Sequence, residues 1–319
     1  MKNFKFFFLG LLCVNLFLFS SCGSDDEDNE PSTEIVDIVA TAQGVADLSM
    51  LVEAVIKTDL TATLQSDGPF TVFAPNNAAF QALLDTNADW SSIEDIPTAA
   101  LTDILLFHVL GANVNSTDLT DSYVTTASLG PDDKQVALQI DVTGGVVFNG
   151  SANPVTVDVE ATNGTVHIIN EVMLRPTVVN HALNNPAFSS LVAALTRTGN
   201  TTDFVAVLSG DGPFTVFAPT NDAFDALIAG SADWNSLDDI PEATLDAVLK
   251  YHVFGGGNVQ AGQLTDGQVV PMLNGSDITI DLSDGAKITT ASGQSVDIII
   301  TDVQGTNGVV HAVNSVLLP

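Results

Sequence analysis

Histidines are the residues of this sequence best suited to chemistry, and four of the five recur as two matched pairs. His108 is repeated as His252, and His167 as His311, in both cases 144 residues later. Two histidines with an aspartate can bind a metal ion, which is one interpretation. The other is a hydrogen-bonded core residue that recurs because the fold recurs, and we favour it. We therefore predict no metal site.

The helix that carries one of these histidines gives a more specific prediction. Leu245, Val248, Leu249 and His252 follow the i, i+3, i+4, i+7 spacing of one helix face. His252 should therefore be buried and should stabilise the fold. Tyr251 points about 100° away on the same helix. We expect it near the rim, with its hydroxyl free to reach solvent or a partner.

Other groups of residues are compatible with binding, but each has a simpler explanation. Acidic residues near both tryptophans could hold calcium, but they lack the spacing and the glycine of a calcium loop, so a solvated loop is the default. The tryptophans could stack on sugars or fill the core, and we favour the core. These residues are Asp89, Trp90, Glu94 and Asp95 in the first half, and Asp233, Trp234, Asp238 and Asp239 in the second.

Motifs typical of catalysis are absent from the sequence. It contains no nucleophile elbow, zinc-protease helix, phosphate-binding loop or dinucleotide-binding glycine motif. We expect neither an enzyme nor a cofactor.

The elements that must position these residues are themselves repeated. The phrase DGPFTVFAP occurs at 67–75 and again, unchanged, at 211–219. A closing motif, NGTVHIIN at 163–170, returns as NGVVHAVN at 307–314, again with an offset of 144 residues. A repeat of this length is a whole domain rather than a solenoid unit. We predict two copies of one domain, at residues 33–175 and 176–319.

Each copy begins with helical periodicity and ends with strand periodicity. FTVFAP alternates as a strand with both faces partly covered, and Asn76 or Thr220 then begins a short helix. A second helix opens at Pro97 or Pro241. The back half alternates with a period of two, as in VALQIDV at 136–142. Helices first and strands later, with one strand between, indicate an α+β domain.

The N-terminal residues resemble an export signal with a lipid attachment site. Two lysines precede the apolar run Phe6–Phe19, and Ser-Ser-Cys follows, which resembles the lipobox of bacterial lipoproteins. The resemblance implies that residues 1–21 are removed and that Cys22 carries the lipid. An ordinary signal peptide with an incidental cysteine is the alternative. The acidic segment at 22–32 should be a solvated tether, and it resembles signals that send lipoproteins to the outer face of the bacterial outer membrane.

The charge of the chain excludes one class of partner. The formal net charge is −31, and losing Lys2 and Lys5 with the signal takes it to −33. Such a chain repels polyanions at long range, so we expect no nucleic acid partner. Removal of the signal also leaves Cys22 as the single cysteine, which excludes a disulfide framework within the mature chain.

Three motifs in a fixed order give a family resemblance. GPFTVFAPTNDAF at 212–224, YHV at 251–253 and NGVVHAVNSVLL at 307–318 resemble the conserved blocks and the Tyr-His motif of fasciclin-like domains. The first copy repeats all three. The resemblance implies two tandem fasciclin-like domains, each a β-sheet wedge with helices packed around it. It also implies partner contact by the Tyr-His region, which here is Tyr251-His252 and, with Phe in place of Tyr, Phe107-His108.

The function implied by the resemblance is non-catalytic cell adhesion or extracellular-matrix interaction. We expect cell-surface or matrix proteins or glycans as partners and membrane contact through the lipid anchor, while the oligomeric state stays open. The alternative is an envelope protein that binds a glycan or small ligand, with calcium as a helper. A concave site with Trp90 or Trp234 at the solvent would favour this alternative. An exposed apolar patch near Tyr251 or at the domain junction would favour adhesion.

Overall fold

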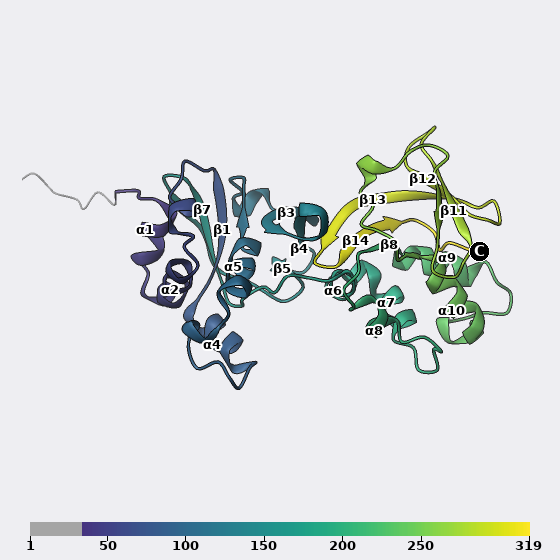
Figure 1. The fold of residues 1–319 in the computed structure, drawn as a ribbon, viewed down its shortest axis with the longest axis horizontal. Coiled ribbons are helices and arrows are strands. Elements are labelled where there is room, and N and C mark those ends of the chain that lie inside the picture. The colour runs from purple at the N-terminus through teal and green to yellow at the C-terminus, as the bar shows by residue number, and fades with distance from the viewer. Residues whose placement is uncertain (1–33) are drawn as a thin grey trace, which may run out of the picture. The chain divides into compact units, whose positions relative to one another are not determined.

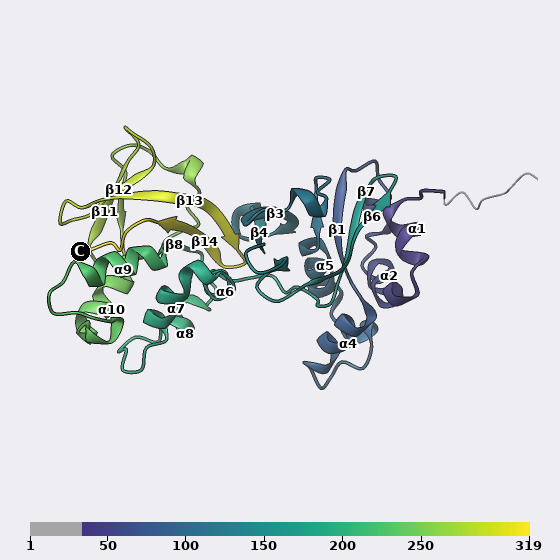
Figure 2. The same cartoon turned by 180° about the vertical axis from the view of Figure 1, so that it is seen from behind.

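The computed structural model describes residues 34–319. The expected signal at 1–21, Cys22 and the tether at 22–32 lie outside the described residues. In the described part, the same series of helices and strands occurs twice along the chain (Figures 1 and 2). None of the helices in this part is both long enough and apolar enough to cross a membrane.

The first domain begins with three short helices and ends in strands. Its elements are α1 (Ile38–Gln43), α2 (Ser49–Lys57), α3 (Thr61–Leu64), β1 (Phe70–Pro75), α4 (Asn77–Asp85), α5 (Thr98–Phe107), β2 (Val109–Leu110), β3 (Ser122–Leu129), β4 (Gln135–Asp141), β5 (Val147–Phe148), β6 (Pro154–Ala161) and β7 (Gly164–Ile169).

The second domain repeats this order. Its elements are α6 (Val178–Asn184), α7 (Ser189–Leu195), α8 (Phe204–Leu208), β8 (Phe214–Pro219), α9 (Asn221–Ala229), α10 (Glu242–Tyr251), β9 (Val253–Phe254), β10 (Val269–Pro271), β11 (Asp277–Asp281), β12 (Lys287–Thr289), β13 (Ser295–Gly305) and β14 (Gly308–Val313). Figures 1 and 2 show the helices of this domain gathered on one side of β13 and β14.

A parallel strand pair lies at the centre of each domain. β1 pairs with β7 in a sheet of order β2-β1-β7-β6, and β8 pairs with β14 in the same way. In the first domain β3, β4 and β5 form a separate sheet, whereas in the second domain β10 to β12 continue the main sheet through β13. The α+β architecture expected from the sequence is therefore present in both copies.

Each central strand is buried on both faces. Val72 and Ala74 enter one hydrophobic cluster, between the sheet and the helices α1, α2, α4 and α5. Phe73 points the other way and enters a second cluster with residues of β4 and β5. In the second domain, Val216 and Phe217 divide between two clusters in the same way. The repeated phrase is thus apolar because both of its faces are core, as its alternation predicts.

The offset between the copies changes in front of the repeated phrase. The capping residues Asp37 and Thr177, which begin α1 and α6, are 140 residues apart, whereas the repeated phrase and the closing motif are each offset by 144 residues. Four extra residues lie between α7 and α8, in the segment after Arg197. The helical residues at 48–64 and 188–208 form two separate helices in each copy. In the first copy the chain turns at Asp59, which has a φ of 56°.

A buried asparagine ties distant segments of each domain together. Asn163 accepts a hydrogen bond from the N–H of Ile38 at 3.0 Å, and its amide nitrogen donates to the carbonyls of Leu64 and Ser66, both at 2.8 Å. Asn307 makes the corresponding bonds to the start of α6 and the end of α8. Asn-Gly is a common turn pair, so local sequence alone indicates only a turn at Asn163-Gly164 and does not reveal this cross-link.

We expect Asn163→Ala to lower the free energy of unfolding by about 2–4 kcal/mol, because it leaves a buried N–H, the buried carbonyl of Leu64 and the part-buried carbonyl of Ser66 without their partner. Asn307→Ala should have a similar effect on the second domain. Urea unfolding of the full chain measures both. The control is Asn235→Ala, at an exposed position. A change below about 0.5 kcal/mol at Asn163 would contradict the cross-link.

Candidate functional site

The first pair of histidines is fully bonded to the backbone. Nδ1 of His108 lies 2.8 Å from the carbonyl of Ile104, and Nε2 accepts the N–H of Met173 at 3.0 Å. Nε2 can accept only if it carries no proton, so Nδ1 must be the donor and the ring must be neutral. His252 repeats this arrangement with Val248 and Leu317.

The environment of these rings disfavours their charged form. His108 and His252 are buried, and this burial lowers the pKa of both to about 4, because an imidazolium there would lose its hydration. The bond to a helix carbonyl opposes the shift only in part. His252 is therefore a buried structural residue, as the helix periodicity predicts.

The expected position of Tyr251 is wrong. Its side chain is 0% exposed, its hydroxyl donates to the carbonyl of Asp277 at 2.7 Å, and it accepts the N–H of Ala291 at 2.9 Å. Phe107, the equivalent residue in the first domain, is also buried. The expectation assumed that α10 has one core face. In fact Leu245, Val248 and Leu249 pack in one cluster and Tyr251 packs in another.

Partner contact by Phe107, His108, Tyr251 and His252 stays a prediction. All four side chains are buried, so a partner would meet the loops that they hold rather than the side chains themselves. Tyr251 shows how such support works, because its hydroxyl joins the start of β11 to the turn before β13.

The second pair of histidines is held in the same way in both copies. His167 stacks on Phe73, and His311 stacks on Phe217, with ring centroids 5.7 Å apart and planes inclined by 27° in each case. Nε2 of His167 lies 2.9 Å from the carbonyl of Val114. Residues 34–319 contain no group of three or more histidine, cysteine and acidic side chains that could hold a metal ion.

The acidic residues near the tryptophans serve local turns. Oδ2 of Asp95 accepts the backbone N–H groups of Ser91 and Ser92 at 2.8 and 2.9 Å, together with their hydroxyls. These bonds lower the pKa of Asp95 to about 2, and the hydroxyl of Ser91 makes the largest contribution. Bonds from Asn235 and Ser236 likewise lower the pKa of Asp239. Each carboxylate thus caps a turn, which fits the solvated-loop interpretation.

The two tryptophans are half-buried rather than fully buried. Trp90 and Trp234 both pack against the edge of a hydrophobic cluster. Trp234 also lines an open cleft of about 480 Å³, together with Leu227, Gly230 and Val316. A concave site with a tryptophan at the solvent would favour the glycan-binding alternative, and this cleft has a half-buried tryptophan in its wall.

Comparison with known proteins decides the family. The model of the Fasciclin domain matches residues 46–175 and 186–319, which is most of the chain. The chain belongs to the fasciclin domain family.

Two relatives and one solved structure illustrate this membership. Protein sll1483 of Synechocystis is 41% identical over 144 residues, a match that covers 45% of this chain and 73% of that protein. The cell surface glycolipoprotein MPB83 of Mycobacterium bovis is 34% identical over 149 residues, which covers 46% of this chain and 62% of that protein. The fold resembles a domain pair of the insect cell adhesion molecule Fasciclin I, with a TM-score of 0.51, 18% identity, and coverage of 86% of this chain and 97% of that one.

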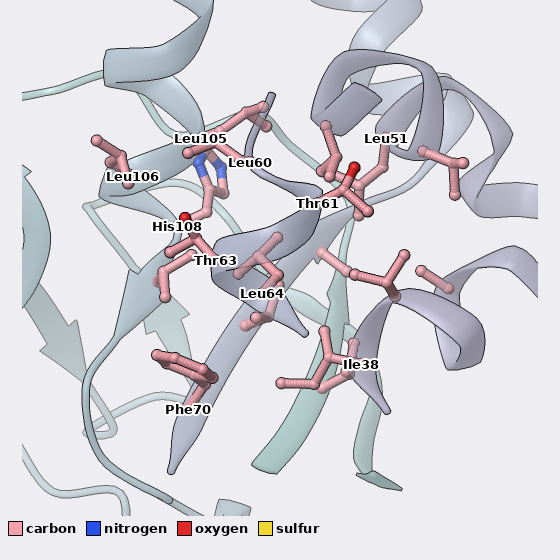
Figure 3. A pocket seen from close by; sticks show the side chains of 18 of the residues that line it. Ile38, Leu51, Leu60, Thr61, Thr63, Leu64, Phe70, Leu105, Leu106 and His108 are labelled. Atoms are coloured by element: carbon pink, nitrogen blue, oxygen red, sulfur yellow. The ribbon is translucent and has the colours of Figure 1, made fainter. Parts of the chain in front are cut away.

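The first fasciclin domain also contains an apolar cavity that the sequence patterns do not reveal. It lies between α1, α2, α3, β1 and α5 (Figure 3). Its lining residues follow the same periodicity as any core residue, so no motif marks them. A position-by-position comparison of the two copies would have identified these lining residues, because some of them differ between the copies.

The neutral histidines predict a specific pH dependence. Their folded-state pKa of about 4 lies below the ordinary 6.5, so the stability they contribute is complete above pH 6.5 and is lost as the pH falls toward 4. For each ring this amounts to about 3 kcal/mol across the window. We expect urea unfolding of the full chain to show a falling midpoint from pH 6.5 to 4.5.

The variant His252→Gln separates this effect from the rest of the chain. Glutamine can keep one donor and one acceptor but does not titrate, so the second domain should lose stability at pH 7 yet depend less on pH between 6.5 and 4.5. An unchanged pH slope would show that His252 does not contribute to it.

Proposed function

We propose that this chain is a non-catalytic cell-surface lipoprotein that mediates cell adhesion or extracellular-matrix contact through its two fasciclin domains. The observation that carries the proposal is the family match over both halves of the chain. Two of the proteins it resembles support the setting, since one is a cell surface glycolipoprotein and the other is an insect cell adhesion molecule.

The internal bonding of the repeated motifs supports a structural use of their polar residues. His108 and His252 use both ring nitrogens on the backbone, and His167 and His311 sit in matching bonds on the other side of the central strand. Side chains that are committed in this way in both copies build the domain. A surface contact must then come from other residues.

Two equivalent strands offer exposed apolar side chains for such a contact. Val155 on β6 is 59% exposed, and Ile299, at the equivalent position of β13, is 51% exposed. Val157 and Ile300 beside them are exposed as well. β6 is the last strand of its sheet, so its outer edge is open to a partner. An exposed apolar position that recurs in both domains, with a second exposed apolar side chain near it in each, favours contact with a cell-surface or matrix protein.

The proposed location is the outer face of the bacterial outer membrane, with the lipid on Cys22 as the anchor. The net charge of −31 disfavours nucleic acid and other polyanions as partners. Glycan binding is the second candidate, and the cleft beside Trp234 is the observation that favours it.

We expect the double variant Val155→Lys with Ile299→Lys to weaken binding to cells or to immobilised matrix proteins at least tenfold, because a charged side chain replaces the apolar one on both strands. The melting temperature should change little, since both side chains are exposed. The matched control is Val269→Lys, an exposed valine (58%) on β10, outside the proposed surface. Binding to a glycan array that the double variant keeps and Trp234→Ala abolishes would favour the second candidate instead.

We expect Cys22→Ser to release the protein from the membrane fraction, because the anchor would be lost while the domains stay folded. Stable anchoring needs more than one acyl chain, and a lipoprotein cysteine supplies them. Fractionation of cells with an immunoblot measures the result. Unchanged sedimentation with the outer membrane would contradict the lipid anchor. It would not affect the adhesion proposal, which the binding experiment tests separately.

A further inference from the structure

The cavity of the first fasciclin domain is almost purely apolar. Its volume is about 80 Å³, and among its lining residues only Thr61, Thr63 and His108 have polar side chains. His108 uses both ring nitrogens on backbone groups, so the cavity meets only the carbon edges of its ring. Figure 3 shows Leu105 and His108 at one end and Leu51 and Ile38 at the other, with Leu60 and Leu64 of the α3 region between them. Such a cavity offers an apolar group nothing but apolar contact.

The second domain fills the equivalent space. There the cavity measures about 20 Å³, little more than one water needs. Two lining positions of the first cavity carry larger side chains in the second domain. Val55 is replaced by Leu195, which lines the smaller cavity, and the half-buried Leu60 is replaced by Phe204, with 0% exposure. Larger side chains therefore occupy volume that the first domain leaves open. The helices and strands around the cavity correspond in the two copies, although the loop before Phe204 is four residues longer, so the same order of elements forms without this cavity.

The partly exposed residues around the cavity are also more apolar in the first domain than in the second. In the first domain Ile56, which is 62% exposed, and the half-buried Leu106 lie among the lining residues. The equivalent positions in the second domain are Thr196 and Lys250, and Lys250 pairs with Asp246 at 2.8 Å. An exposed isoleucine costs solubility and does nothing for the core. Beside an apolar cavity, it extends the apolar surface from the interior to the solvent.

We propose that this cavity of the first domain binds the end of the aliphatic chain of a single-chain, uncharged amphiphile. A dry cavity of about 150 Å³ takes the six carbons of a benzene molecule, so a space of about 80 Å³ is too small for a ring and admits only the end of a linear chain, about three carbons. The rest of the chain would lie along the apolar side chains of Ile56 and Leu106. The polar end of the ligand would stay at the rim, where Thr61 and Thr63 supply hydroxyls. An uncharged end fits a chain of net charge −31 better than a carboxylate does. The site is independent of the adhesion surface on β6 and β13.

The test uses 1-decanol as the probe and 1-adamantanol as a bulky control of similar polarity. The protein is the full chain with Cys22→Ser, so that no acyl chain of its own competes. We expect calorimetry to show one decanol per chain, with methyl NMR shifts at Ile56 and Leu60, and at least tenfold weaker binding of adamantanol. Equal binding of the two alcohols, or no decanol binding up to its solubility limit, would overturn the proposal.

Two variants copy the second domain into the first. Leu60→Phe should weaken decanol binding at least tenfold, because it places a phenyl ring in the cavity at the position that corresponds to Phe204 in the second domain. Ile56→Thr with Leu106→Lys changes only the partly exposed residues and should weaken binding about threefold or more while leaving the core intact, which keeps the test valid if Leu60→Phe disturbs folding. The matched control Leu273→Phe, at an exposed position of the second domain, should bind as the parent does. Unchanged affinity in both cavity variants would place the decanol elsewhere and overturn the assignment.

Discussion

Each domain depends on one buried amide that joins three separate parts of the chain. Asn163 bonds to Ile38, Leu64 and Ser66, which lie between 97 and 125 residues away in sequence. The glycine that follows is equally constrained, because a Cβ on Gly164 would lie 2.0 Å from the carbonyl oxygen of Phe70. The backbone of the last strand can therefore approach β1 only with glycine at this position. The first helix, the turn before β1 and the last strand are fixed to one another at this one point.

This constraint explains why the order of elements survives in both copies while the spacing does not. Four extra residues separate α7 from α8, yet Asn307 reaches the start of α6 and the end of α8 just as Asn163 reaches their counterparts. The insertion lies in a loop, where additional length costs little free energy. The contacts that define the domain lie on either side of that loop and are unaffected.

Much of the fold follows from periodicity and repetition in the sequence, and the site shows where that reasoning ends. The repeated strand, the two helices after it and the α+β class all follow from local spacing. The position of Tyr251 does not, because a helical pattern reveals one apolar face and cannot show that a second core lies beyond it. The same limit applies to Asn163, which looks like a turn residue until the segments it bonds are brought together. Both depend on contacts between residues far apart in sequence, which no local pattern contains.

The repeat also separates the residues that build a domain from those free to bind. Positions that are the same in both copies, such as the phenylalanine and histidine stacked on each central strand, have matching bonds and burial, so the fold accounts for them. At Leu60 and Phe204 the order of elements is again the same, but the loop in front is four residues longer in the second copy and the volume left inside the domain is different. A well-packed domain gains stability by filling such a space, as the second copy does. Because a phenylalanine fits at this position in the second copy, the leucine of the first copy makes that domain less stable than it could be. The space that remains open is the place to look for a function specific to the first domain.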